Sequence, residues 1–370
     1  MKQGKTVQEL GRELQRQRNN SQDFIADTRS LEMETTAYGA TLHMTIDGKT
    51  YGFSVNEVAH QQIANRLNIP YRYYQKMRTE APELLNANVN TWLSQNPERR
   101  MIRVIDGKVR AFLSDRYRRL DNLELCAAVL PVIQEMKGAN IESCEVTSTR
   151  MYLKVVNKKL KAEVTVGDVV QAGFVISNSE VGLGSLRVEP LIFRLACKNG
   201  MICKDYAQKK YHVGRQVNVS EDSAYELYSD KTLAQDDKAF FMKVKDVVRT
   251  AVDETRFMLT VNKMRETTQI PLSHEPVKEV EILADKFQLT ENERGDVLRQ
   301  LFMSGDNSRY GLMNAVTAAS KLAKSYDRAT DLERIGGEIL AMPIPRKMLP
   351  PAVDEMLEME PVYENTRRFA

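Results

Sequence analysis

The stretch VVQAGFVISNSEVGLGSLRVEPLIFRLAC, residues 169–197, decides the fold. It holds two long runs rich in valine, isoleucine and phenylalanine, separated by a short link that contains Gly182 and Gly184. Three further runs of this kind precede it, at residues 141–149, 150–156 and 162–166. Such residues favour strands, and the links are too short for the helices that join parallel strands. We therefore predict five strands of one mostly antiparallel sheet.

Upstream of these strands, the sequence predicts two more hairpins and several helices. The hairpins turn at Asp47-Gly48 and Asp106-Gly107, because Asp-Gly suits the positive backbone angles of a two-residue turn. Helical spacing indicates helices at about 6–18, 54–67, 82–95 and 121–136, the second capped by Ser54 or Asn56. The pattern thus alternates short strands with helices.

Downstream, long helices with few glycines are predicted at roughly 220–265, 275–287, 291–304, 309–326 and 328–341. We therefore predict an α+β fold, with a mixed, mostly antiparallel sheet and flanking helices, followed by an α-helical C-terminal part. The expected segments are an N-terminal helix and linker (1–30), an α+β core domain (31–219), a helical region (220–342) and a proline-containing acidic tail (343–370).

The composition points to a folded protein without a membrane segment. No run approaches the roughly 18 consecutive apolar residues of a membrane span, and the first residues have no signal-peptide core. The 4 cysteines in 370 residues are too few for a disulfide framework, and we expect free thiols in a reducing compartment. These features predict a cytoplasmic protein.

The net charge of +3 conceals two basic blocks. Residues 66–119 hold 12 lysines and arginines against 5 acids, and residues 150–215 hold the same numbers, whereas residues 216–300 hold 12 against 17. Cations gathered on one face attract an anionic partner. The alternative is that basic and acidic segments fold against each other and cancel.

Within the basic blocks, three segments interleave tyrosines with cations, at residues 70–78, 114–122 and 204–215. Cationic grooves and aromatic faces bind single-stranded nucleic acid through phosphates and stacked bases. The alternative is that the tyrosines belong to the core and the cations to a solvated rim. The candidate nucleic-acid-binding residues are Arg72, Tyr73, Lys76, Arg116, Tyr117, Arg118, Arg119, Lys209, Lys210, Tyr211 and Arg215.

Evidence for catalysis or for a cofactor is weak. Cys197, Cys203 and His212 are metal-ligand types, but the C-x5-C spacing and the missing fourth ligand are unlike a closed zinc site. The Gly-x-Gly at 182–184 lacks the third glycine and following helix of a dinucleotide site, and we interpret it as a turn between strands. We expect no cofactor and, on balance, no enzyme.

Three segments carry a resemblance: LSDRYRRLDN (113–122), ISNSEVGLGSLRVEPLIFRLACKNGM (176–201) and SRYGLMNAVTAASKLAKSYDRATDLERIGGEIL (308–340). Over residues 25–340 the chain resembles an uncharacterised phage/plasmid-like protein family, domain of unknown function family 932. The family's motifs are matched by Asn178-Ser179, by residues 194–200 and by residues 314–317. The resemblance implies a mobile-element protein of a bacterial host cell. It also permits a tight turn at Asn199-Gly200 after a central strand, burying Cys197.

Three functions remain open. The first is a non-enzymatic protein of mobile-element replication or recombination that binds nucleic acid, single-stranded DNA above all, with helices that mediate oligomer contacts. The second is an interaction protein that acts on a host protein, and the third is a metal-dependent enzyme that uses residues 178–215. A central polar cluster is expected at Asn178, Ser179, Arg194 and Asn199, where Arg194 is either a ligand group or the partner of a buried carboxylate.

Overall fold

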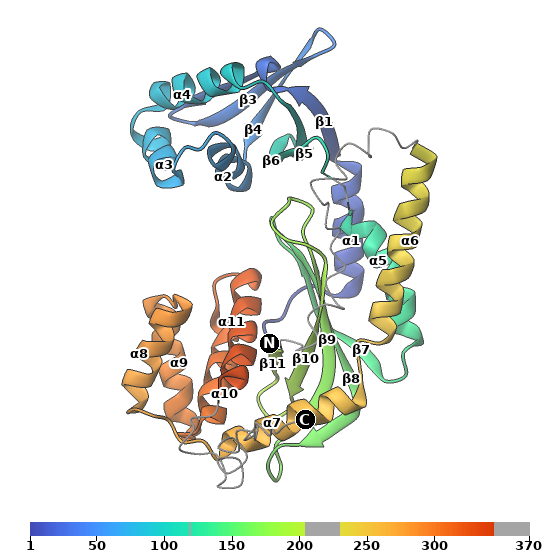
Figure 1. Cartoon of the computed structure of the whole chain (residues 1–370), viewed down its shortest axis with the longest axis vertical. Coiled ribbons are helices and arrows are strands. Elements are labelled where there is room, and N and C mark those ends of the chain that lie inside the picture. The colour runs from blue at the N-terminus through green and yellow to red at the C-terminus, as the bar shows by residue number, and fades with distance from the viewer. Residues whose placement is uncertain (118–119, 204–229, 344–370) are drawn as a thin grey trace, which may run out of the picture.

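The computed structural model describes residues 1–117, 120–203 and 230–343. The described residues form two mostly antiparallel sheets with flanking helices and a helical C-terminal part, which confirms the α+β class. The hairpins predicted upstream form a sheet of their own. Figure 1 shows this sheet at one end of the molecule, with the second sheet standing below it.

The N-terminal sheet has six strands in the order β1-β5-β6-β4-β3-β2. Both predicted turns are confirmed, because Asp47 and Asp106 adopt φ of 51° and 50° and the glycine after each is also left-handed. The strands are β1 (Ser21–Asp27), β2 (Leu31–Thr36), β3 (Gly39–Ile46), β4 (Lys49–Val55), β5 (Arg99–Ile105) and β6 (Lys108–Ser114).

Three helices pack on this sheet: α2 (Glu57–Arg66), α3 (Tyr71–Glu80) and α4 (Pro82–Gln95). Asn56 caps α2, since its side chain accepts a hydrogen bond of 2.9 Å from the Ala59 amide. Helix α4 covers the edge strand β2. The Asn86 and Asn90 side chains each bond both the amide and the carbonyl of one β2 residue, at 2.7–3.2 Å, as a neighbouring strand would.

The second sheet has the order β11-β10-β9-β8-β7. The five predicted runs form four of these strands, because two of them merge into one strand, β8, whose register shifts between Val156 and Lys161. The fifth strand, β11, was not predicted. The predicted Asn199-Gly200 turn is wrong, because the chain reverses at 195–198 with Lys198 at φ 50°, and Asn199 begins the last strand. The strands are β7 (Ala139–Val146), β8 (Met151–Glu163), β9 (Val169–Asn178), β10 (Arg187–Arg194) and β11 (Asn199–Ile202).

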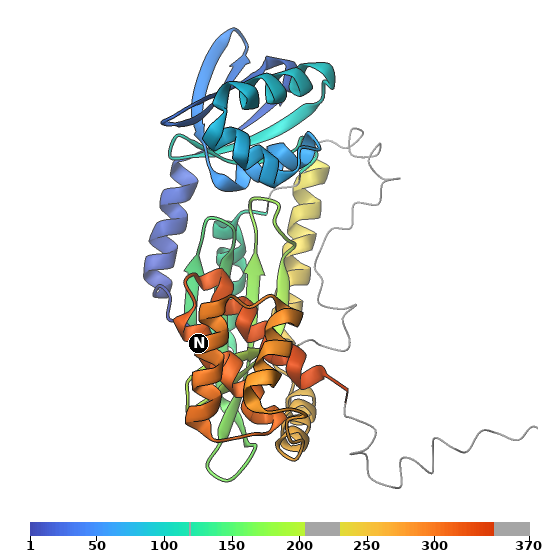
Figure 2. The ribbon, with the colours of Figure 1, turned by 90° about the vertical axis from the view of Figure 1, so that its left-hand side faces the viewer.

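Helices cover both faces of this sheet. Helices α1 (Val7–Asn19), α5 (Asn122–Glu135) and α6 (Asp230–Arg249) lie on one side, and α8 (Pro276–Phe287), α9 (Glu291–Ser304), α10 (Arg309–Ala319) and α11 (Tyr326–Ala341) lie on the other (Figures 1 and 2). The predicted helix at 220–265 is interrupted, because Asp253 caps a separate helix, α7 (Glu254–Thr268). Short 3-10 turns occur at Thr28–Ser30 and Ser320–Leu322.

Helix α11 contacts the five-stranded sheet unusually closely. A Cβ on Gly337 would clash with the Ile202 carbonyl oxygen, so the helix backbone lies directly on β11. Nearby, the Lys154 ammonium of β8 lies 2.5 Å from the Glu333 carboxylate, and both side chains are fully buried. Among the helices that the structure describes, none is long and apolar enough to cross a bilayer.

Candidate functional site: an exposed helix face and two polar clusters

Helix α3 separates its tyrosines into two groups. Tyr74 is buried and its hydroxyl lies 2.8 Å from His60 Nδ1, while the Tyr71 hydroxyl donates to the Glu57 carboxylate. Burial lowers the pKa of His60 to about 4, so this imidazole is neutral at pH 7. These two tyrosines therefore hold α3 against α2, as the core interpretation predicted.

The outer face of α3 carries the remaining tyrosine and two cations. Tyr73 is 49% exposed, and Arg72 and Lys76 are exposed one helical turn apart. Among the described residues Arg72 has no ion-pair partner, and Lys76 lies 3.9 Å from the equally exposed Glu80. The predicted combination of aromatic ring and cations is therefore present on one solvent-facing surface, which we call the α3 face (Arg72, Tyr73 and Lys76).

The segment after β6 has a different role from the one that we predicted. Tyr117 is partly buried and its hydroxyl donates to the Ser179 carbonyl at 3.1 Å, so its ring belongs to the junction between the two sheets. Arg116 is exposed. Six predicted nucleic-acid residues lie outside the described part of the chain: Arg118, Arg119, Lys209, Lys210, Tyr211 and Arg215.

The predicted central polar cluster divides into two clusters at opposite ends of the five-stranded sheet, because Asn178 ends β9 whereas Arg194 pairs with Val170 near its start. At the first end, the Asn178 amide donates to the Leu120 carbonyl at 2.9 Å and to Asn122 at 2.8 Å. The Ser179 hydroxyl donates to the Thr149 carbonyl at 2.8 Å. These side chains therefore organise the loops at the junction.

The same junction contains a buried arginine that was not among the predicted site residues. Arg103 of β5 contacts the Asp23 and Asp121 carboxylates at 2.9 and 3.0 Å and donates to the Glu180 carbonyl at 2.9 Å. Arg110 of β6 lies 3.1 Å from the Glu180 carboxylate. Both guanidinium groups are bonded to carboxylates or carbonyls of the protein itself, which favours a structural role for the two arginines. The only local signal is an arginine within the apolar run 101–105.

At the opposite end, Arg194 is the partner of a buried carboxylate, the second of the two alternatives. Its Nε donates to Asp168 at 2.6 Å, and the Tyr310 hydroxyl donates to the other Asp168 oxygen at 2.6 Å. Asn199 lies on the neighbouring strand opposite Arg194 and is 2% exposed. Its two side-chain polar atoms have no hydrogen-bond partner among the described residues. This cluster joins β10, β11 and α10.

The four cysteines are free, as predicted, and two of them were metal candidates. Cys197 is half-buried and accepts a hydrogen bond of 3.3 Å from Arg194, which corrects the prediction that it is buried. Burial raises the pKa of Cys203 to about 12, so its thiol is protonated at neutral pH. In the part of the chain described, no three metal-ligating side chains come together. His212 lies outside that part.

Comparison with known proteins identifies the family. No curated protein and no solved structure matches this chain. A family model described as Domain of unknown function (DUF932) matches residues 111–337. The match begins within β6, the last strand of the six-stranded sheet, and includes all of the five-stranded sheet, both polar clusters and most of α11. Since it spans more than half of the chain, the protein belongs to the family of domain of unknown function 932.

Proposed function

We propose that this protein binds nucleic acid, single strands in preference to duplex, and that the α3 face is one contact surface. The observation that supports this proposal is that Tyr73 is exposed beside the Arg72 and Lys76 cations. Tyr71 and Tyr74, by contrast, pack against the core. An exposed ring stacks on an unpaired base, and the flanking cations contact its phosphates. Duplex bases are already stacked, so the ring favours single strands.

The basic segment at 204–215 extends this proposal beyond the described residues. It begins directly after Cys203, the last described residue of that part of the chain, and it supplies Lys209, Lys210, Tyr211 and Arg215. The composition of these two segments fits a sequence-independent binder, because rings and cations read neither base identity nor groove pattern. A role in mobile-element replication or recombination belongs to the same proposal.

The test is fluorescence anisotropy with labelled single-stranded and duplex DNA of one sequence, measured over a salt series. Each phosphate contact on a single strand contributes about 0.7 to the slope of log affinity against log salt. Arg72→Ala combined with Lys76→Ala should therefore reduce the slope by about 1.4 and weaken binding. Tyr73→Ala should weaken single-strand binding by about 1–3 kcal/mol and leave the slope unchanged.

The matched control removes the same two residue types from the C-terminal helices. Arg294 and Lys278 are exposed on α9 and α8, and Arg294→Ala with Lys278→Ala changes the net charge equally. Equal losses in both double variants would mean that only the overall charge matters. Absence of binding by the unaltered protein near physiological salt would reject nucleic-acid binding itself, and an unaffected Tyr73→Ala variant would reject the α3 face.

A further inference from the structure

Four exposed lysines gather on the five-stranded sheet, in the half of β8 that lies away from the junction. Three of them belong to β8 and one lies in the turn between α5 and β7. Within the described part of the chain none of the four has an ion-pair partner. The acids in the same two segments are Glu135 and Glu163, so the cations outnumber them. We call this surface the β8 lysine patch: Lys137, Lys158, Lys159 and Lys161.

A bulge in β8 carries three of these lysines. From Val156 to Lys161, β8 advances five residues while its partner strand β9 advances only two. The Asn157 side chain shapes the extra length, because its oxygen accepts hydrogen bonds from the Lys159 and Leu160 amides at 3.0 and 3.2 Å. Bulges of this kind redirect side chains and are common beside functional sites. The bulge is therefore a defined structure and not a frayed end of the strand.

The turn before β7 holds Lys137 next to this bulge. The Lys158 amide donates to the Gly138 carbonyl at 2.9 Å. The Asn157 side chain donates to the Lys137 carbonyl at 3.3 Å. Gly138 adopts φ of 87°, and a Cβ at this position would lie 2.8 Å from Cγ of Lys159. The stem of Lys159 therefore lies against this glycine, and the two segments carry their lysines side by side.

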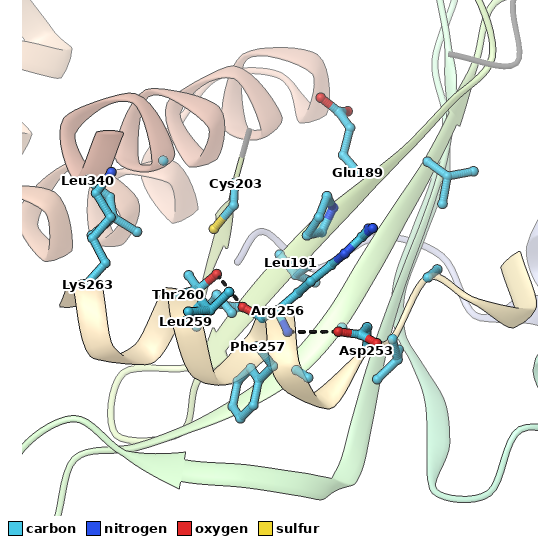
Figure 3. Close-up of a pocket in the computed structure, with 18 of the residues that line it drawn as sticks. Glu189, Leu191, Cys203, Asp253, Arg256, Phe257, Leu259, Thr260, Lys263 and Leu340 are labelled. Atoms are coloured by element: carbon cyan, nitrogen blue, oxygen red, sulfur yellow. Dashed lines mark hydrogen bonds between the residues drawn. The ribbon is translucent and has the colours of Figure 1, made fainter. Parts of the chain in front are cut away.

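The patch faces away from the helix that covers this part of the sheet. Leu160 and Ala162 pack into the same core as Phe257 of α7. Figure 3 shows α7 lying against the strands. Successive side chains of a strand point to opposite faces, so Lys161 projects to the other side, where it is exposed. The apolar residues of the bulge thus fix it to the protein, and its lysines face solvent.

The β8 lysine patch and the α3 face lie on different sides of the junction between the two sheets. Asn178 at the junction and Gln171 beside the bulge are seven residues apart on β9, which is about 23 Å along a strand. Figure 1 shows α3 with the six-stranded sheet at one end of the molecule, and β8 in the body below it. The two surfaces therefore contact different phosphates.

The chemistry of the two surfaces also differs. Tyr73 gives the α3 face a ring for an unpaired base, whereas the β8 lysine patch consists of ammonium groups alone. An ammonium group binds phosphate as a point charge and needs no unpaired base. Duplex DNA presents the denser array of phosphates, with one charge per roughly 1.7 Å of helix axis. The composition of the patch therefore fits the backbone of a duplex.

We propose that the β8 lysine patch binds the backbone of duplex DNA while the α3 face holds a single strand, so that one chain joins two segments of nucleic acid. This inference rests on the proposed function and extends it to substrates with both single-stranded and duplex parts. Because the patch supplies charge and no stacking, its binding of duplex depends steeply on salt and is independent of sequence.

Capture of duplex DNA by a protein already bound to a single strand tests this inference on the full chain. Beads that carry a single-stranded oligonucleotide are saturated with protein, and a labelled duplex of unrelated sequence is added over a salt series. We expect capture of the duplex. Alanine at Lys158, Lys159 and Lys161 together should reduce the slope of log affinity for the duplex against log salt by about 2.7, since each contact contributes about 0.9. Binding to the single strand should stay unchanged.

The matched control replaces three exposed lysines of the C-terminal helical part with alanine: Lys278, Lys286 and Lys324. This variant should capture duplex as the unaltered protein does, and so should a variant with arginine at the three β8 positions. A protein that binds the single strand and captures no duplex would overturn the inference alone, as would equal capture by the patch and control variants. Failure to bind the single strand would reject the proposed function and the inference with it.

Discussion

Lys154 and Glu333 form an ion pair that is completely removed from water. The pair has an additional cation–π contact, since the Lys154 ammonium lies 4.6 Å from the centre of the Tyr326 ring. One Glu333 oxygen, Oε1, is buried without a hydrogen-bond partner in the described part of the chain. A buried pair with an unsatisfied oxygen has a high desolvation cost, so its contribution to stability is smaller than its distance suggests.

We therefore predict that replacing one member of this pair lowers the free energy of unfolding much more than replacing both members. Glu333→Leu alone leaves a buried ammonium without its counter-ion and should lower the free energy of unfolding by about 3–5 kcal/mol. Lys154→Met combined with Glu333→Leu should recover most of that loss. Urea unfolding followed by circular dichroism measures both values. A double variant that is as unstable as the single one would show that the ion pair itself stabilises the fold.

At the scale of elements, the contact between α11 and β11 depends on one residue without a side chain. Gly337 brings the helix backbone against the Ile202 carbonyl, whereas Gly295 in the middle of α9 faces open space. Both glycines lie inside a helix, but Gly337 is tightly packed and Gly295 has no neighbouring atoms where a side chain would lie. They therefore separate the effect of packing from that of helix propensity.

We predict that Gly337→Ala is destabilising by several kcal/mol, because the added methyl group forces α11 away from the sheet. Gly295→Ala should instead stabilise the protein by up to about 1 kcal/mol, since alanine is the better helix former. Melting temperatures of the two variants give the comparison directly. A stabilised Gly337→Ala variant would contradict the close approach of α11 to β11.

At the scale of the whole molecule, Arg103 links two bodies that have separate cores. The core of the six-stranded sheet, around Leu42, Tyr74 and Phe112, is distinct from the cores on either face of the five-stranded sheet. Arg103 reaches from β5 to the cap of α5 and to the Glu180 carbonyl. Cooperative unfolding of the two bodies should therefore depend on this side chain.

Arg103→Met is expected to divide thermal unfolding into two transitions, because Asp23 and Asp121 lose their shared partner while both cores stay intact. Differential scanning calorimetry distinguishes two peaks from one. Arg99→Met, an exposed arginine at the start of the same strand, is the matched control and should keep one peak. Identical traces for the two variants would mean that apolar contacts alone hold the junction.

Local features of this fold could be predicted from the sequence, and long-range ones could not. The Asp47-Gly48 turn and the Asn56 cap depend on neighbouring residues, so short motifs predict both correctly. The Asn199-Gly200 turn failed because pairing with β10 outweighs the turn preference of that dipeptide.

The candidate sites follow the same rule. Exposure of Arg72, Tyr73 and Lys76 is consistent with helical spacing, which places Tyr74 and Met77 on the buried side. Arg103 and Asp23 are 80 residues apart, and no periodicity in either segment indicates their contact. For the same reason Asn178 and Arg194 were predicted in one cluster, whereas the fold places them at opposite ends of one sheet.

The helices that pack on the edge strands β2 and β11 have a consequence for synthesis on the ribosome. Strand β2 and the asparagines of α4 that cover it are separated by only about fifty residues, so this edge closes soon after it forms. Strand β11, which ends the other sheet, lacks the helix that packs on it until α11 has been made, more than a hundred residues later. During that interval the growing chain exposes a bare strand to its neighbours. Chaperone demand should therefore peak late in translation.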